Sequence, residues 1–138
     1  AHARAGVLAV AAAGNGRVGP DGVRRGVDTD ADPHYPSNVP GVVSVAAATH
    51  ADELAPFSNF GTRTVDLAAP GVDILGTVPG GYVAIPGTSM ASPHAAGAAA
   101  LLFAHRPDLT PEAAHQLLLA GADPVPALAG RTVSGGRL

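Results

Sequence analysis

The sequence predicts an α/β fold in which helices flank a mostly parallel sheet. Short apolar segments alternate with loops rich in Gly and Pro, and two helical segments follow them. Short continuous apolar runs are typical of strands that are buried on both faces, as strands of parallel sheets are. A chain of 138 residues suits one domain of this kind.

Apolar runs predict five strands, at residues 7–13, 42–48, 65–69, 72–75 and 82–85. The first run ends in Gly14-Asn15-Gly16, which indicates a turn directly after a strand. Residues 17–40 are rich in Gly, Pro and Asp and show neither helical nor strand periodicity. We therefore expect a long surface loop there, and long ordered loops often carry function.

Two helices are expected in the second half of the chain. Residues 89–104 are mostly Ala and Leu, and apolar side chains cover nearly the whole circumference, so this helix should be buried. The second helix has Thr110 as N-cap, Pro111 in the first helical position and Gly121 at its end.

Composition excludes several classes of function. The net charge is −3, and the eight basic residues are scattered, so no basic stripe could follow a nucleic acid. No apolar run is long enough to span a membrane. The absence of Cys excludes disulfides, thiolate zinc sites and a Cys nucleophile.

Gly14-Asn15-Gly16-Arg17-Val18-Gly19 matches the dinucleotide-binding pattern G-x-G-x-x-G. That pattern binds a pyrophosphate only where a helix begins at the glycines. Here Pro20, Gly22 and Gly26 follow without apolar periodicity, which disfavours a nucleotide-binding domain.

Ser89 lies in the first turn of the predicted buried helix. There a Ser hydroxyl meets unpaired backbone N–H groups and the positive end of the helix dipole, and both stabilise an oxyanion formed by attack on a carbonyl. The alternative is that Ser89 only caps a core helix.

The stretch around Ser89 resembles the nucleophile signature of the subtilase family. It reads G-T-S-M-A-S-P-H from Gly87 to His94 and continues A-A-G-A-A-A-L-L. Further segments resemble the same family in the same order: Ala11-Ala12-Ala13-Gly14-Asn15, Tyr35-Pro36, 42–47, Phe57-Ser58, Gly61, Ala69-Pro70-Gly71-Val72 and 134–138. The resemblance covers nearly the whole chain.

The resemblance implies a partial subtilisin-like three-layer fold, with residues 1–138 as the C-terminal part of a catalytic domain. It implies that Ser89 is the nucleophile and that Asn15 and the Ser89 N–H form the oxyanion hole. The backbone of Ala12, Ala13 and Gly14 would pair with the substrate and wall the pocket for the residue before the cut. His34 would border that pocket, unless it is a solvated loop histidine.

The Asp and the His base that such a protease needs are not recognisable here. The resemblance places both before Asn15, where no Asp occurs and where His2 lacks the following Gly. His94 lies about 140° around the helix from Ser89, so it should point away. Asp28-Thr29-Asp30 follows Asn15 and lacks the Gly of the Asp motif. His50, His105 and His115 have no motif around them and should be solvated.

The resemblance thus predicts a secreted serine endopeptidase that hydrolyses polypeptides through a Ser89 acyl-enzyme and needs no cofactor for chemistry. This chain would be inactive alone, because the N-terminal half of its domain is missing. The alternative is a non-catalytic relative that binds peptides or partners. Asp28, Asp30 and Asp32 alternate in a loop and could surround a structural Ca²⁺, although Pro33 stands where an EF-hand has Gly.

Overall fold

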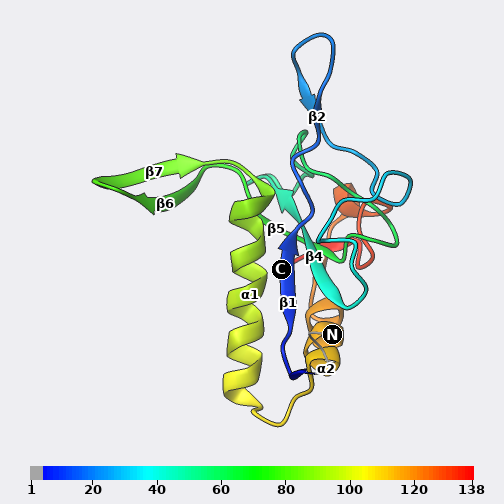
Figure 1. Cartoon of the computed structure of the whole chain (residues 1–138), viewed down its shortest axis with the longest axis vertical. Helices are drawn as coiled ribbons and strands as arrows, with labels where there is room; N and C mark the ends of the chain where they lie inside the picture. Colours follow the sequence, from blue (N-terminus) through cyan, green and yellow to red (C-terminus); the bar gives the residue numbers. More distant parts are fainter. Residues whose placement is uncertain (1–4) are drawn as a thin grey trace.

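A five-stranded, mostly parallel sheet forms the centre of the chain (Figure 1). The computed structural model describes residues 5–138. The strands follow the spatial order β1 (Ala9–Ala12), β4 (Val42–Ala48), β5 (Leu67–Pro70), β9 (Gly136–Arg137) and β8 (Asp123–Pro124). The first four strands run parallel to one another, and only β8 runs antiparallel, on β9. The α/β prediction is therefore confirmed.

β4 is the central element, and all seven of its residues are buried. Because side chains alternate across a strand, β4 contributes to two cores. Val43 and Val45 belong to the core that includes residues of both helices. Ala46 and Ala48 face the second core, which contains Leu128 of the 3-10 helix η2 (Pro126–Leu128). One face of the sheet is thus covered by helices and the other by η2 and loops.

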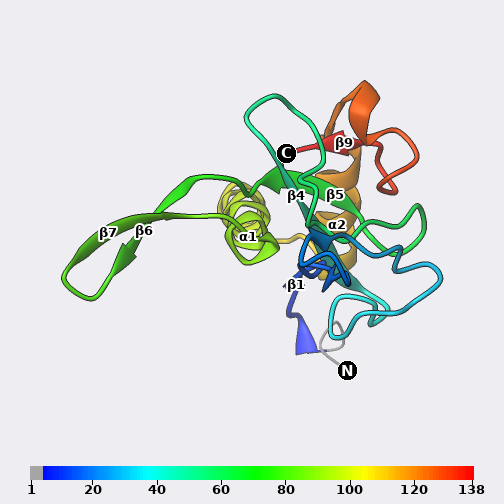
Figure 2. The ribbon, with the colours of Figure 1, turned by 90° about the horizontal axis from the view of Figure 1, so that it is seen from above.

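Helix α1 (Thr88–His105) lies along the sheet beside β1 and β4 but is covered on one face only (Figure 2). Its buried residues recur with helical spacing: Thr88, Ala91, Ala95 and Ala99. Leu101 on the other side is 73% exposed. The prediction that this helix is buried all round is therefore wrong for this chain. The exposed face carries no Asp, Glu, Lys or Arg, which is unusual for a face in contact with water.

The second helix matches its prediction closely. α2 spans Pro111–Ala120, and the Thr110 side chain accepts a hydrogen bond from the Ala113 N–H at 3.2 Å. Leu118 joins the core shared with α1. Within residues 5–138, no helix is long and apolar enough to cross a membrane.

Two hairpins extend from the body. β6 (Ile74–Val78) and β7 (Gly81–Ile85) project well away from the sheet, with Tyr82 73% exposed (Figure 1). β2 (Arg17–Val18) and β3 (Arg24–Arg25) form a short hairpin inside the segment that we expected to be loop. The turn sequence Pro20-Asp21-Gly22 explains this hairpin, because Gly22 adopts φ +77° and Asp21 accepts a hydrogen bond from the Val23 N–H.

His115 differs from the prediction that it is solvated. Its Nε2 lies 3.0 Å from an oxygen of Asp66, and both side chains are largely buried. The other Asp66 oxygen accepts a hydrogen bond from the Ser44 N–H at 2.7 Å. Hydrogen bonding to Asp66 raises the pKa of His115 against the opposing effect of burial, and the charge of Glu112 adds to the increase.

The His115–Asp66 pair predicts a pH-dependent contribution to stability. Because the pKa of His115 is raised on folding, the contribution is full below the pKa of the unfolded chain and is lost as pH rises through the folded value. We expect His115→Gln to cost about 1 kcal/mol of unfolding free energy at pH 5.5 and much less at pH 8.5. Denaturant titration at both pH values measures this, with the exposed His105→Gln as control. An equal loss at both values would contradict the pairing.

Candidate active site

Ser89 is the second residue of α1 and is exposed to solvent. The N–H groups of the first turn of a helix have no acceptor within the helix. The Thr88 N–H donates to Asn15, whereas the Ser89 N–H donates to no residue that the structure describes. Gly87, at φ +157°, makes the turn that brings the chain into the helix. Ser89 therefore combines a free hydroxyl with a free N–H at the positive end of α1.

Asn15 follows β1 and is tied to the start of α1 by Thr88. Its Oδ1 accepts hydrogen bonds from the Thr88 N–H at 2.9 Å and from the Thr88 hydroxyl at 2.8 Å. Because a backbone N–H can only donate, the atom facing Thr88 must be the oxygen, and Nδ2 is turned away. Nδ2 points to the Gly87 side. It lies 3.5 Å from the position that a Cβ on Gly87 would occupy, which is an ordinary van der Waals distance. Asn15 thus presents a fixed donor beside the turn that leads to Ser89.

The backbone of Ala13 and Gly14 is fully engaged within the chain. The Ala13 N–H donates to Val45, and the Gly14 N–H donates to the Thr88 hydroxyl. The carbonyls of Ala13 and Gly14 accept from the side chain and the backbone of Asn59. Neither residue therefore has a free N–H among the described residues, and pairing of the Ala12, Ala13 and Gly14 backbone with a substrate strand stays a prediction. Together with Ala12, the last residue of β1, they can still form a wall.

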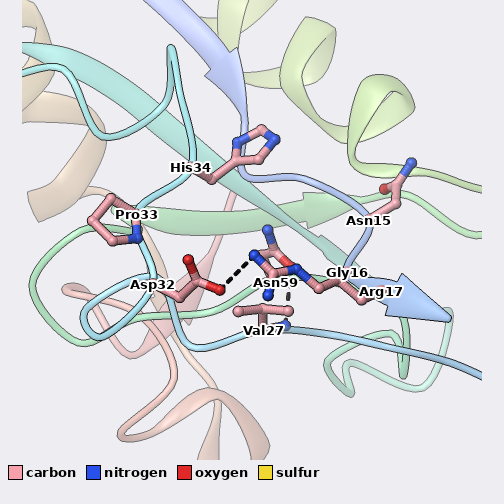
Figure 3. Close-up of a pocket in the computed structure, with 8 residues that line it drawn as sticks. All are labelled: Asn15, Gly16, Arg17, Val27, Asp32, Pro33, His34 and Asn59. Atoms are coloured by element: carbon pink, nitrogen blue, oxygen red, sulfur yellow. Dashed lines mark hydrogen bonds and ion pairs between the residues drawn. The ribbon is translucent and has the colours of Figure 1, made fainter. Parts of the chain in front are cut away.

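His34 lines a cavity (Figure 3), and its ring lies next to Gly14. Its Nε2 would be 2.9 Å from a Cβ on Gly14. Its Nδ1 lies 3.0 Å from the Ser37 hydroxyl. A cavity of about 100 Å³ opens between His34 and Asn15, and the ion pair of Arg17 with Asp32, at 2.6 Å, lines it.

The described residues place no base on Ser89. His94 does not reach Ser89 with its Nδ1, which donates instead to the Met90 carbonyl of the same helix at 2.8 Å. It shares a groove of about 430 Å³ with Ser89, between α1 and the β6–β7 hairpin. His2 lies outside the described residues. The structure therefore presents an exposed Ser89 hydroxyl, a free Ser89 N–H and a free Asn15 Nδ2, with an open groove beside Ser89.

Comparison with known proteins shows the family of this chain. The sequence model of the subtilase family matches residues 1–135. The chain belongs to the subtilase family. It is similar to subtilisin from Bacillus pumilus, with 48% identity over 77 residues, which are 55% of this chain and 28% of that protein. It is also similar to a thermophilic serine proteinase from Bacillus sp. (strain AK1), with 48% identity over 98 residues, or 70% of this chain and 21% of that one.

The fold of this subtilase chain has a solved counterpart. A cold-adapted subtilisin-like serine proteinase superposes with a TM-score of 0.80 and 38% identity, covering 94% of this chain and 44% of the other. The subtilisin-like fold expected from the sequence is thus confirmed. The chain spans less than half of that structure and between about a fifth and a third of the curated relatives named above.

The glycine-rich segment does not form a nucleotide site, and the three loop aspartates have separate partners. The glycines at 14–19 lead into β2 and not into a helix, so no helix N-terminus is available for a pyrophosphate. Of the three loop aspartates, Asp28 accepts from the Asp30 N–H and Asp32 pairs with Arg17. Burial opposes ionisation of Asp30, but hydrogen bonds from Thr64, Thr62 and Arg63 outweigh it and lower its pKa.

Calcium binding by this loop therefore stays a prediction. Within the described part of the chain, no three His, Cys, Asp or Glu side chains gather where they could hold a metal ion. The carboxylates of Asp28, Asp30 and Asp32 face different partners, and the structure offers no shared site for them.

Two residues that shape the site were not identified from the sequence. Thr88 orients Asn15 across 73 positions of the chain, and Asn59 holds the carbonyl of Ala13 and the Val27 N–H. Thr88 was visible as a neighbour of Ser89 in the G-T-S motif, but its contact with Asn15 had no local signal. Asn59 follows Phe57-Ser58, and no spacing rule links it to Ala13.

The close approach at Gly14 gives a testable prediction. A Cβ there would lie 2.5 Å from Asn59 Nδ2, and the residue has φ +104°. We expect Gly14→Ala to lower the unfolding free energy by about 3 kcal/mol, from backbone strain and overpacking together. Gly130→Ala is the matched control, because Gly130 has φ +70° but open space around it, and it should lose about 1 kcal/mol. Denaturant unfolding measures both, and equal losses would show that the space beside Gly14 is not occupied.

Proposed function

We propose that this chain supplies the nucleophile and the oxyanion hole of a serine endopeptidase. The Ser89 oxygen bonds to the carbonyl carbon of a peptide while its proton passes to a base. The carbonyl oxygen becomes an oxyanion, which the Ser89 N–H and Asn15 Nδ2 stabilise. Return of the proton to the amine breaks the C–N bond, and water then hydrolyses the acyl-enzyme.

The observation that carries this proposal is the way Thr88 holds Asn15. Two hydrogen bonds to Oδ1 fix the carboxamide, so that Nδ2 remains free next to the turn before Ser89. No residue in the described range accepts from this Nδ2, so the donor is available to a ligand. A preorganised donor of this kind stabilises developing charge without having to reorganise during the reaction.

The catalytic His and Asp, on this proposal, come from a polypeptide segment outside this chain. Three features support a docking surface for that segment. The groove beside Ser89 is open, the outer face of α1 is uncharged, and β1 is an edge strand of apolar sequence. Edge strands without charge or Pro readily accept another strand. The segment would therefore extend the sheet at β1, cover α1 and place its base in the groove.

A polypeptide substrate and an extracellular location follow from the family as further parts of the proposal. The similar proteins named above are a subtilisin and serine proteinases. Nothing in the chemistry at Ser89 requires a cofactor.

Labelling with a fluorophosphonate probe tests the proposed function. We expect the full-length polypeptide that contains this chain to label at Ser89 and to hydrolyse peptides, because its base activates the hydroxyl. Ser89→Ala should abolish both activities, whereas Ser92→Ala, three residues further along the same helix, should preserve them. The 138-residue chain alone should label little, because the described residues place no base on Ser89.

Two outcomes would contradict the proposal in different ways. Rapid labelling of the 138-residue chain at Ser89 would mean that no outside base is required. A full-length polypeptide that folds but neither labels nor hydrolyses any peptide would favour the non-catalytic alternative, in which the site only binds peptides or partners.

A further inference from the structure

Arg24 is an exposed arginine that lies directly against Asn15. Its Nη1 donates to the carbonyls of Asn15 at 3.2 Å and Gly16 at 3.3 Å. The other two arginines of the β2–β3 hairpin are neutralised, since Arg17 pairs with Asp32 and Arg25 pairs with Asp21, both at 2.6 Å. Among residues 5–138, no acidic side chain pairs with Arg24. A net positive charge therefore remains beside the oxyanion donor.

The register of the hairpin explains why Arg24 is left unpaired. Val18 is opposite Arg24, and Arg17 is opposite Arg25. Because side chains alternate along a strand, Arg24 lies on the other face of the hairpin from Arg25. The two ion pairs belong to the Arg17 and Arg25 face. Arg24 instead lines a groove of about 370 Å³ together with Asn15, Phe57 and Pro86, and none of these residues is acidic.

The groove at Arg24 and the cavity at His34 are separate recesses that share Asn15. The family resemblance predicts that the cavity at His34 receives the substrate residue before the cut. Pro86, in the Arg24 groove, comes just before the Gly87 turn that leads to Ser89. If Ser89 attacks a peptide bond held at the Asn15 donor, the residues before the cut occupy the His34 side, and the residues after the cut extend toward Arg24. This placement of the substrate rests on the proposed function.

We propose that Arg24 is a specificity-determining residue that binds an acidic side chain located after the cut. A guanidinium has five N–H donors, and Nη1 is the atom that holds the carbonyls of Asn15 and Gly16. The edge formed by Nε and Nη2 remains free, and it matches the two oxygens of a carboxylate. The Phe57 ring forms an apolar wall on which the methylene groups of Glu can pack. The substrate class is therefore a polypeptide with Glu or Asp on the leaving side.

The test uses the full-length polypeptide that contains this chain and peptides that differ only at the two positions after the cut. We expect kcat/KM for Glu to exceed that for the isosteric Gln about fivefold, and the ratio to shrink as salt rises from 50 to 500 mM, as for a solvent-exposed ion pair. Arg24→Gln should bring the Glu-to-Gln ratio to about one, and Arg24→Glu should favour Lys. Arg106→Gln removes a charge at the far end of α1 and should leave the ratio unchanged.

The Glu-to-Gln ratio of kcat/KM distinguishes recognition of an acidic side chain by Arg24 from a structural role of Arg24. Arg24 also holds the Asn15 and Gly16 carbonyls, so its loss can lower kcat/KM for all peptides. A purely structural role would lower kcat/KM equally for the Glu and the Gln peptides, and their ratio would not change. Arg24→Lys retains the charge and a partial preference, and it replaces Arg24→Gln if that variant does not fold. Equal rates for Glu and Gln in the unaltered protein, or a preference that survives Arg24→Gln, would overturn the assignment. Failure to cleave any peptide would instead contradict the proposed function.

Discussion

Two hydrogen bonds from Thr88 to the carboxamide oxygen of Asn15 connect the end of β1 with the start of α1. The rest of the site depends on this connection, because it joins residues 73 positions apart and sets the direction of Asn15 Nδ2. The same hydroxyl accepts from the Gly14 N–H, so the wall beside the site is held by the same side chain. Gly14 has no side chain, and this leaves room for His34 and Asn59 at that point.

Sequence reasoning located the elements whose signals are local. The apolar run at 42–48 is β4, and the Thr110 and Gly121 signals enclose α2, because caps and buried runs act through neighbouring residues. The β2–β3 hairpin was missed although Pro20-Asp21-Gly22 is a turn signal, because its two-residue strands have no periodicity. The prediction of an all-round buried α1 was wrong because burial depends on what covers a helix. The apolar outer face of α1 is in the sequence, but no element within residues 5–138 packs on it.

The candidate site likewise has features with local sequence signals and features that depend on distant residues. The roles of Ser89, Asn15 and His34 were predicted from the family resemblance, and the structure brings Asn15 close to the turn before Ser89 and His34 close to Gly14. The engagement of the Ala13 and Gly14 backbone could not be predicted, because its partners Asn59 and Thr88 are distant in sequence. The expected solvation of His115 failed for the same reason, since Asp66 comes from the segment before β5.

Charge is distributed unevenly around Asn15. The cavity on the His34 side contains a closed ion pair between Arg17 and Asp32, whereas the groove on the other side has Arg24 without an acidic partner. Side-chain alternation in a hairpin with two-residue strands is enough to produce this difference. A short, exposed element thus adjusts the electrostatics of a site whose donors are fixed by the sheet and by α1.

The geometry at Asn15 and Ser89 can be measured directly in a crystal structure of the full-length polypeptide with a peptide boronic acid. Boron should bond to the Ser89 oxygen, and one boronate oxygen should lie about 2.7–3.1 Å from both Asn15 Nδ2 and the Ser89 nitrogen. The Asn15 oxygen should still accept from Thr88. A boronate bonded at Ser89 whose oxygens all lie beyond hydrogen-bonding distance of Asn15 Nδ2 would contradict the role of Asn15 as an oxyanion donor.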